Sequence, residues 1–168
     1  MKAVGVLIAI ALALALQTTL ARFLVGGTAA LDLVLVVVVY VALTSGPVTG
    51  MLAGGLAGII QDALSSGVIG IGGLAKSTVG FVAGVIGQQF IVTAALPRLV
   101  IFLASTAAHA AVFMGLYVLL GLRSFSSPWA AILSQALGNA AVGMMAFTII
   151  ESFPGVVERR RLSKRTRH

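Results

Sequence analysis

Two ionisable side chains, Asp62 and Lys76, lie 14 positions apart in the stretch QDALSSGVIGIGGLAK, residues 61–76. Nearly all their neighbours are apolar or small, and a charge in such surroundings needs a partner or water. We expect an ion pair between them, either direct or bridged by Gln61 or water. Two alternatives stay open: separate solvation of Asp62 at an interface and of Lys76 by loop carbonyls, and a role in binding a ligand or a proton.

Three further polar side chains could do chemistry. His109 lies in the apolar stretch ASTAAHAAVF, one turn after Ser105. We expect a neutral imidazole that bonds a helix carbonyl or hydroxyl, with a proton relay as the alternative. Gln135 and Asn139 are spaced i, i+4 on one predicted helix, and we expect these amides to hold helices together rather than to bind a substrate.

The motifs of known catalytic sites are missing from the sequence. It has no GxSxG, no HExxH and no paired carboxylates, and GIGGLAKSTVG does not match a phosphate-binding loop, because Ala75 precedes the lysine. Cysteine is absent, so disulfides and thiolate metal sites are excluded. We therefore expect no enzyme activity, no catalytic residue, no metal and no cofactor.

The composition is that of a membrane protein. Of the 168 residues, 60% are hydrophobic and only 9% are charged, whereas soluble domains carry about 25% charged residues. The net charge of +7 does not indicate nucleic-acid binding, because six of the eleven basic residues lie within the last ten positions. We expect these six to contact anionic lipid, with enforcement of the membrane orientation as their sole role left as the alternative: Arg159, Arg160, Arg161, Lys164, Arg165 and Arg167.

Six apolar runs have about the length needed to cross a bilayer as helices. The sequence therefore predicts an all-α, polytopic membrane protein with six transmembrane helices in residues 1–151 and a basic cytoplasmic tail in residues 152–168. The predicted spans are Ala3 to about Ala21, about Ala30 to Thr44, Pro47 to Leu64, about Val68 to Gly87, about Leu99 to Leu120, and Pro128 to about Ile150.

The basic residues predict the orientation, because lysine and arginine are retained on the cytoplasmic side of short loops. With both termini inside, the inner face carries Lys2, Arg98 and the tail, and the outer face carries only Arg22 and Arg123. The first run also resembles a cleavable signal peptide. We favour a retained helix, because the apolar run is long enough to span.

Glycines recur every fourth residue in the third and fourth runs, and Lys76 occupies one place of the second series. Such small faces let membrane helices approach closely. The two runs are joined by the short turn at residues 65–67, so they should be antiparallel neighbours with Asp62 and Lys76 facing into the bundle. We predict helix packing and partner contact for Asp32, Gly50, Gly54, Gly58, Gln61, Asp62, Gly72, Lys76, Gly80 and Gly84.

Three segments together resemble the rod shape-determining protein MreD family: LDLVLVVVVYVAL (31–43), GPVTGMLAGGLAGIIQDAL (46–64) and GVIGIGGLAKSTVGFVAG (67–84). The resemblance covers about residues 17–90 and is carried by Asp32, Gln61, Asp62 and the stretch 67–73. It implies a bacterial inner-membrane subunit of the wall-elongation machinery. The implied partners are MreC, the filament MreB, the glycosyltransferase RodA and its partner transpeptidase.

The sequence is compatible with two functions. The first is a scaffold that holds an MreC-like protein, with a homo-oligomer also possible. The second follows from a resemblance in the six-helix plan to the substrate-binding subunits of energy-coupling-factor vitamin transporters. In such a carrier the inward polar residues would line a ligand chamber: Gln17, Gln61, Asp62, Lys76, His109, Gln135 and Asn139. Ligand chambers are usually walled by aromatic side chains, and this chain has one tryptophan and two tyrosines. The sequence therefore favours the scaffold.

Overall fold

The computed structural model describes residues 3–23, 31–65, 67–89, 94–125 and 127–152. These residues form six helices and no strand, which confirms the predicted all-α class. The helices are α1 (Ala3–Phe23), α2 (Leu33–Ser45), α3 (Pro47–Leu64), α4 (Ile71–Gln89), α5 (Ala95–Leu119) and α6 (Trp129–Ser152). The basic tail, Lys2 and the side chain of Arg22 lie outside the described part, so the predictions for them are not tested.

The helix starts differ from the predicted ones for local reasons. Helix α2 begins at Leu33 because the Asp32 carboxylate accepts a hydrogen bond from the Leu35 amide and caps the helix. Helix α4 begins at Ile71 rather than near Val68, since Gly70 has a φ of +104°, a conformation that side-chain-bearing residues rarely adopt. Helix α5 includes Pro97 in its first turn, where a missing N–H removes no helical bond.

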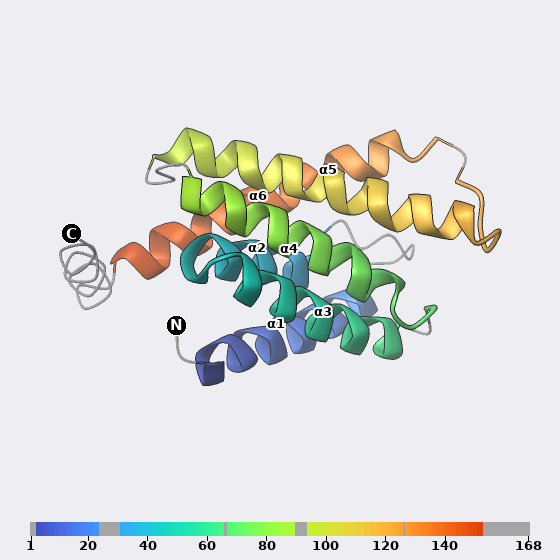
Figure 1. The fold of residues 1–168 in the computed structure, drawn as a ribbon, viewed down its shortest axis with the longest axis horizontal. Helices are drawn as coiled ribbons and strands as arrows, with labels where there is room; N and C mark the ends of the chain where they lie inside the picture. The colour runs from blue at the N-terminus through green and yellow to red at the C-terminus, as the bar shows by residue number, and fades with distance from the viewer. Residues whose placement is uncertain (1–2, 24–30, 66, 90–93, 126, 153–168) are drawn as a thin grey trace.

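Helix α2 is the centre of the bundle and packs against all five other helices. Its side chains belong to two apolar clusters, one shared with α1 and α3 and one shared with α4, α5 and α6. Helices α3 and α4 run side by side, and α5 and α6 form a second pair (Figure 1). A residue at the start of α2 is therefore within reach of several helices at once.

The α3–α4 pair is held by backbone contact along its glycines. A Cβ atom added to Gly54 would meet the backbone of Lys76, and one added to Gly58 would meet the backbone of Gly72 and Gly73. The same holds for Gly50 against Gly80 and for Gly84 against Pro47. The two helices thus touch without intervening side chains, the form of packing that small residues permit in membranes.

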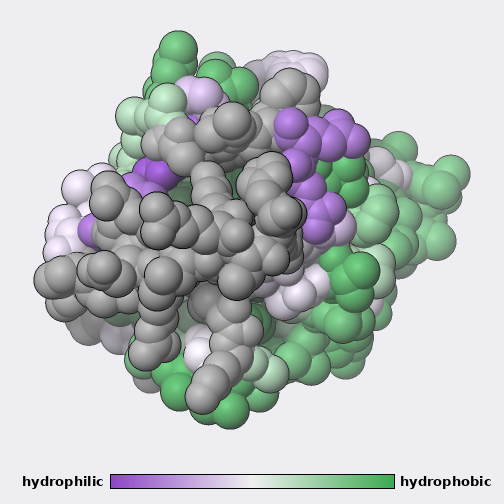
Figure 2. Space-filling model, turned by 60° about the vertical axis from the view of Figure 1, so that its left-hand side comes forward, coloured by the Kyte–Doolittle hydropathy of each residue, from purple (hydrophilic) through white to green (hydrophobic). Residues whose placement is uncertain are grey.

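The outer surface of the bundle is largely apolar. Large hydrophobic side chains are exposed on every helix except α2, among them Leu12, Leu52, Phe81, Leu119 and Leu137. In Figure 2 hydrophobic residues form much of the visible periphery. By length and composition, α5 and α6 are the helices of the described part that could cross a membrane, and α1 and α2 are shorter apolar helices.

Candidate functional site

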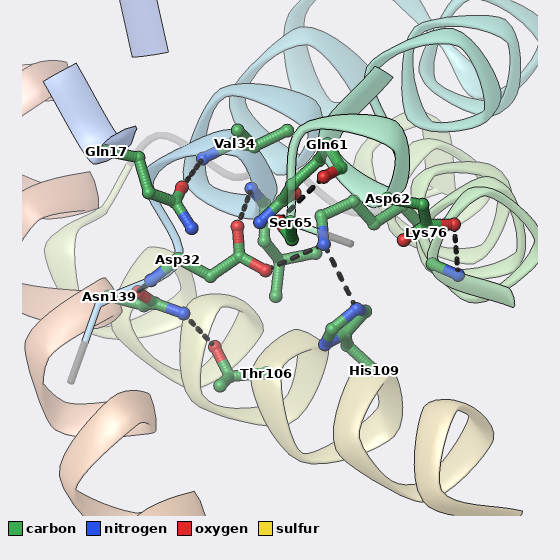
Figure 3. Close-up of polar contacts among 12 residues, drawn as sticks. Gln17, Asp32, Val34, Gln61, Asp62, Ser65, Lys76, Thr106, His109 and Asn139 are labelled. Carbon is green, nitrogen blue, oxygen red and sulfur yellow. Dashed lines mark hydrogen bonds and ion pairs between the residues drawn. The ribbon is translucent and has the colours of Figure 1, made fainter. Parts of the chain in front are cut away.

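Lys76 forms a buried ion pair with Asp32. The distance from its ammonium nitrogen Nζ to Asp32 Oδ2 is 2.7 Å, and the two side chains are 3% and 5% exposed. The other carboxylate oxygen, Oδ1, accepts from the Leu35 amide at 2.9 Å. One carboxylate therefore caps α2 and joins it to α4 (Figure 3).

The predicted ion pair between Asp62 and Lys76 is wrong. Asp62 Oδ2 instead accepts hydrogen bonds from the amides of Gly70 and Gly72, each at 2.9 Å, and of Gly73 at 3.4 Å. The first amides of a helix have no partner inside it and carry partial positive charge, so they attract a carboxylate. Lys76 lies five residues after Ile71, about 8 Å further along the axis, where α4 faces α2.

His109 on α5 is the second partner of Lys76. The ammonium nitrogen lies 3.2 Å from the imidazole Nε2 (Figure 3). This corrects the expected partner, a helix carbonyl or hydroxyl near Ser105. A lysine ammonium has only donors, so Nε2 accepts and the ring proton is on Nδ1. Within the described part of the chain, the buried Nδ1 has no hydrogen-bond partner.

Asn139 on α6 links three helices. Its side-chain oxygen accepts from the backbone amide of Asp32 at 2.8 Å, and its amide nitrogen donates to Thr106 Oγ1 on α5 at 3.2 Å. Thr106 in turn donates to the Phe102 carbonyl. Asn139 therefore holds helices together, as the sequence predicted, while Gln135 is half-buried one turn earlier on α6.

Two further polar side chains, Gln17 and Gln61, lie on α1 and α3. On α1, Gln17 Oε1 accepts from the Val34 amide at 3.3 Å. On α3, Gln61 is half-buried, its backbone carbonyl accepts from Ser65, and its side-chain oxygen is buried without a partner among the described residues. We call the set Asp32, Lys76, Thr106, His109 and Asn139 the buried polar network.

Two features of the structure were not predicted from the sequence. The first is the pairing of Asp32 with Lys76, for which the sequence carries no local signal, because α2 and α4 are not consecutive helices. The second is the pair of Arg98 with Glu151, whose side chains meet through two hydrogen bonds of 2.6 and 2.8 Å. The Arg98 guanidinium also lies 4.5 Å from the ring centre of Phe147, so this pair joins the start of α5 to the end of α6.

The chemistry available to the buried polar network is hydrogen bonding and charge pairing. Within the described ranges there is no group of three or more histidines, cysteines and acidic residues that could hold a metal ion. The network takes its members from α4, α5, α6 and the cap of α2. Its observed contacts fix helices against each other.

These observations define a class: a small, all-α bundle with an apolar surface, glycine-mediated helix contacts and charges that are neutralised inside, as in integral membrane proteins. The chain belongs to the family of the rod shape-determining protein MreD, whose family model matches residues 1–153. Neither the curated proteins nor the solved structures gave a match. Membership of this family implies a membrane protein with a role in determining rod shape.

Proposed function

We propose that this protein is a non-enzymatic, multi-pass subunit of the bacterial inner membrane that supports cell-wall elongation by holding an MreC-like partner. Through that partner it would act with MreB, RodA and the transpeptidase that works with RodA. The observation that carries this proposal is the family match over residues 1–153. The proposed topology has six spans and both termini in the cytoplasm.

The contacts of the polar residues support a scaffold over a vitamin carrier. Lys76, His109 and Asn139 were candidates for lining a ligand chamber, and their side chains bond to other residues of the same chain. A carrier would instead use such groups to bind its ligand. Native mass spectrometry of the purified protein separates the two, because a carrier is expected to retain a small molecule and a scaffold is not.

The topology can be tested by cysteine labelling, since the natural chain has no cysteine. Cysteines at Ser124 and Ser66 are expected to react with an impermeant reagent applied outside the inner membrane, because basic residues concentrate at the other side. A cysteine at Ser163 should react only after permeabilisation, which makes it the matched control. Labelling of Ser163 in sealed cells would overturn the proposed orientation.

The partner's helix would use an outward face, because the glycines of α3 and α4 are occupied by contacts within the chain. The two ends of α5 expose large side chains such as Val100 and Val118, whereas the middle of the helix exposes small residues. Small residues allow a second membrane helix to approach closely. This face consists of Ala104, Ala108, Ala111 and Gly115.

We expect Ala108→Leu to weaken co-purification of an MreC-like partner by about tenfold, equal to about 1.4 kcal/mol, and to leave the thermal stability of the protein unchanged. Cells that carry only this variant should become rounder. Ala141→Leu is the matched control, since Ala141 is exposed on α6, and it should keep normal co-purification. Equal effects of both variants would exclude the α5 face, and normal rods after complete deletion would exclude the elongation role in that host.

A further inference from the structure

The geometry around His109 fixes the protonation of the site at neutral pH. The 2.7 Å distance between Lys76 Nζ and Asp32 Oδ2 is typical of a charge-assisted hydrogen bond, so the lysine is an ammonium. An ammonium can only donate, so the imidazole at 3.2 Å must accept through an unprotonated Nε2. The imidazole is therefore neutral while this contact exists.

The charged neighbours of His109 come from two helices. Lys76 on α4 contacts it directly, and Asp32 at the start of α2 contacts Lys76. The contribution of α6 to the network is Asn139, which does not titrate. Asp62 on α3 is bonded to the first amides of α4. A second proton on His109 would place two cations beside a single carboxylate and remove the acceptor that Lys76 uses.

The hydrogen bond that protonation of His109 would break joins α4 to α5. The Lys76–His109 bond crosses from one helix to the other (Figure 3), and imidazolium beside ammonium is repulsive. The two helices would move apart at this level, whereas Asn139 and Thr106 would still hold α5 to α6. The expected movement is therefore α4 against α5.

A row of aromatic rings leads from His109 to one end of the bundle. The imidazole stacks on Phe113 with ring centres 5.7 Å apart, and Phe113 lies 4.9 Å from Tyr117. The Tyr117 hydroxyl accepts from the Val68 amide at 3.4 Å, in the turn before α4. A displacement of α4 at Lys76 would therefore also disturb the hydrogen bond between the Tyr117 hydroxyl and this turn.

We propose that His109 is a proton-binding site that controls the contact between α4 and α5. With His109 neutral, Lys76 bridges Asp32 and His109 and the helices are closed; with His109 protonated, the bridge to α5 opens. This inference goes beyond the proposed scaffold and does not depend on the identity of its partner.

The protonation state is tested by ¹⁵N NMR of the imidazole in the full chain, embedded in a lipid nanodisc. The sequence has two histidines, so His168→Gln leaves His109 as the single signal. At about pH 8 we expect the tautomer with its proton on Nδ1, and on acidification to about pH 3 we expect conversion to imidazolium, since burial and the adjacent ammonium oppose a second cation. A proton on Nε2 at about pH 8, or an imidazole that stays neutral throughout, would overturn the proposal.

The movement is tested by the distance between spin labels on Thr78→Cys of α4 and Ala107→Cys of α5, both at exposed positions. On acidification we expect this distance to grow by about 1–2 Å, the size of helix shifts in other switching proteins. His109→Gln is the matched control, because its side-chain oxygen can accept from Lys76 and cannot titrate. An unchanged distance with His109, or the same change with glutamine, would disprove the control of helix contact by His109.

Discussion

Lys76→Gln is expected to lower the free energy of unfolding by about 3 to 5 kcal/mol, and Asp32→Asn in the same chain is expected to restore much of that loss. The reason is the burial of the pair: removal of the ammonium leaves the carboxylate charged, buried and unpaired. Asparagine is the appropriate partner change because it also caps helices well. The double variant therefore loses the charges and keeps the cap of α2.

A double-mutant cycle on thermal unfolding in detergent measures this coupling. The matched control is the cycle of Asp62→Asn with Lys76→Gln. The structure joins Asp62 to the glycine amides of α4 and not to Lys76, so this second cycle should be additive within about 0.5 kcal/mol. Additivity in the first cycle, or strong coupling in the second, would contradict the assignment of partners.

The same variants connect stability to function. Single changes at Lys76 or Asp32 should reduce the amount of folded protein in the membrane and make rod-shaped cells rounder. The double variant should recover part of the rod shape, since the scaffold would use its outer surface and not these charges. A double variant that is stable but still gives round cells would indicate that the charges themselves act in the function.

The helices could be predicted from the sequence because each is a local property. An apolar run of sufficient length must be helical in a membrane, and all six predicted runs became helices within a few residues. The glycine spacing also predicted the α3–α4 contact, since the two helices are consecutive and joined by a short turn. Local sequence determined both results.

The partner of Lys76 could not be predicted in this way. Sequence spacing indicates which residues are close only for consecutive helices, and α2 is not consecutive with α4. The central position of α2 depends on the packing of all six helices, and it alone brings Asp32 to Lys76. Asp62 was misassigned because the turn at Gly70, which aims the first amides of α4 at its carboxylate, is not visible in an apolar pattern.

The second large effect on stability is expected from a change in the glycine contact between α3 and α4. Gly54→Leu is expected to destabilise the protein by about 3 kcal/mol or more, at or above the usual range for overpacking. A Cβ at this position would meet the backbone of Lys76 and Ser77, which cannot rotate away as a side chain would. The helices would have to separate, and the displacement of Lys76 would also strain its pair with Asp32.

Gly5→Leu is the matched control for Gly54→Leu, because both glycines lie inside helices and an added Cβ at Gly5 meets nothing within 4 Å. The control should change stability by less than about 1 kcal/mol, since leucine also has the higher helix propensity. The measurement is the thermal unfolding midpoint of both variants in the same detergent. If Gly54→Leu unfolds at the same temperature as Gly5→Leu, the α3–α4 backbone contact is not what holds the bundle, and Lys76 must be positioned by its charge partners alone.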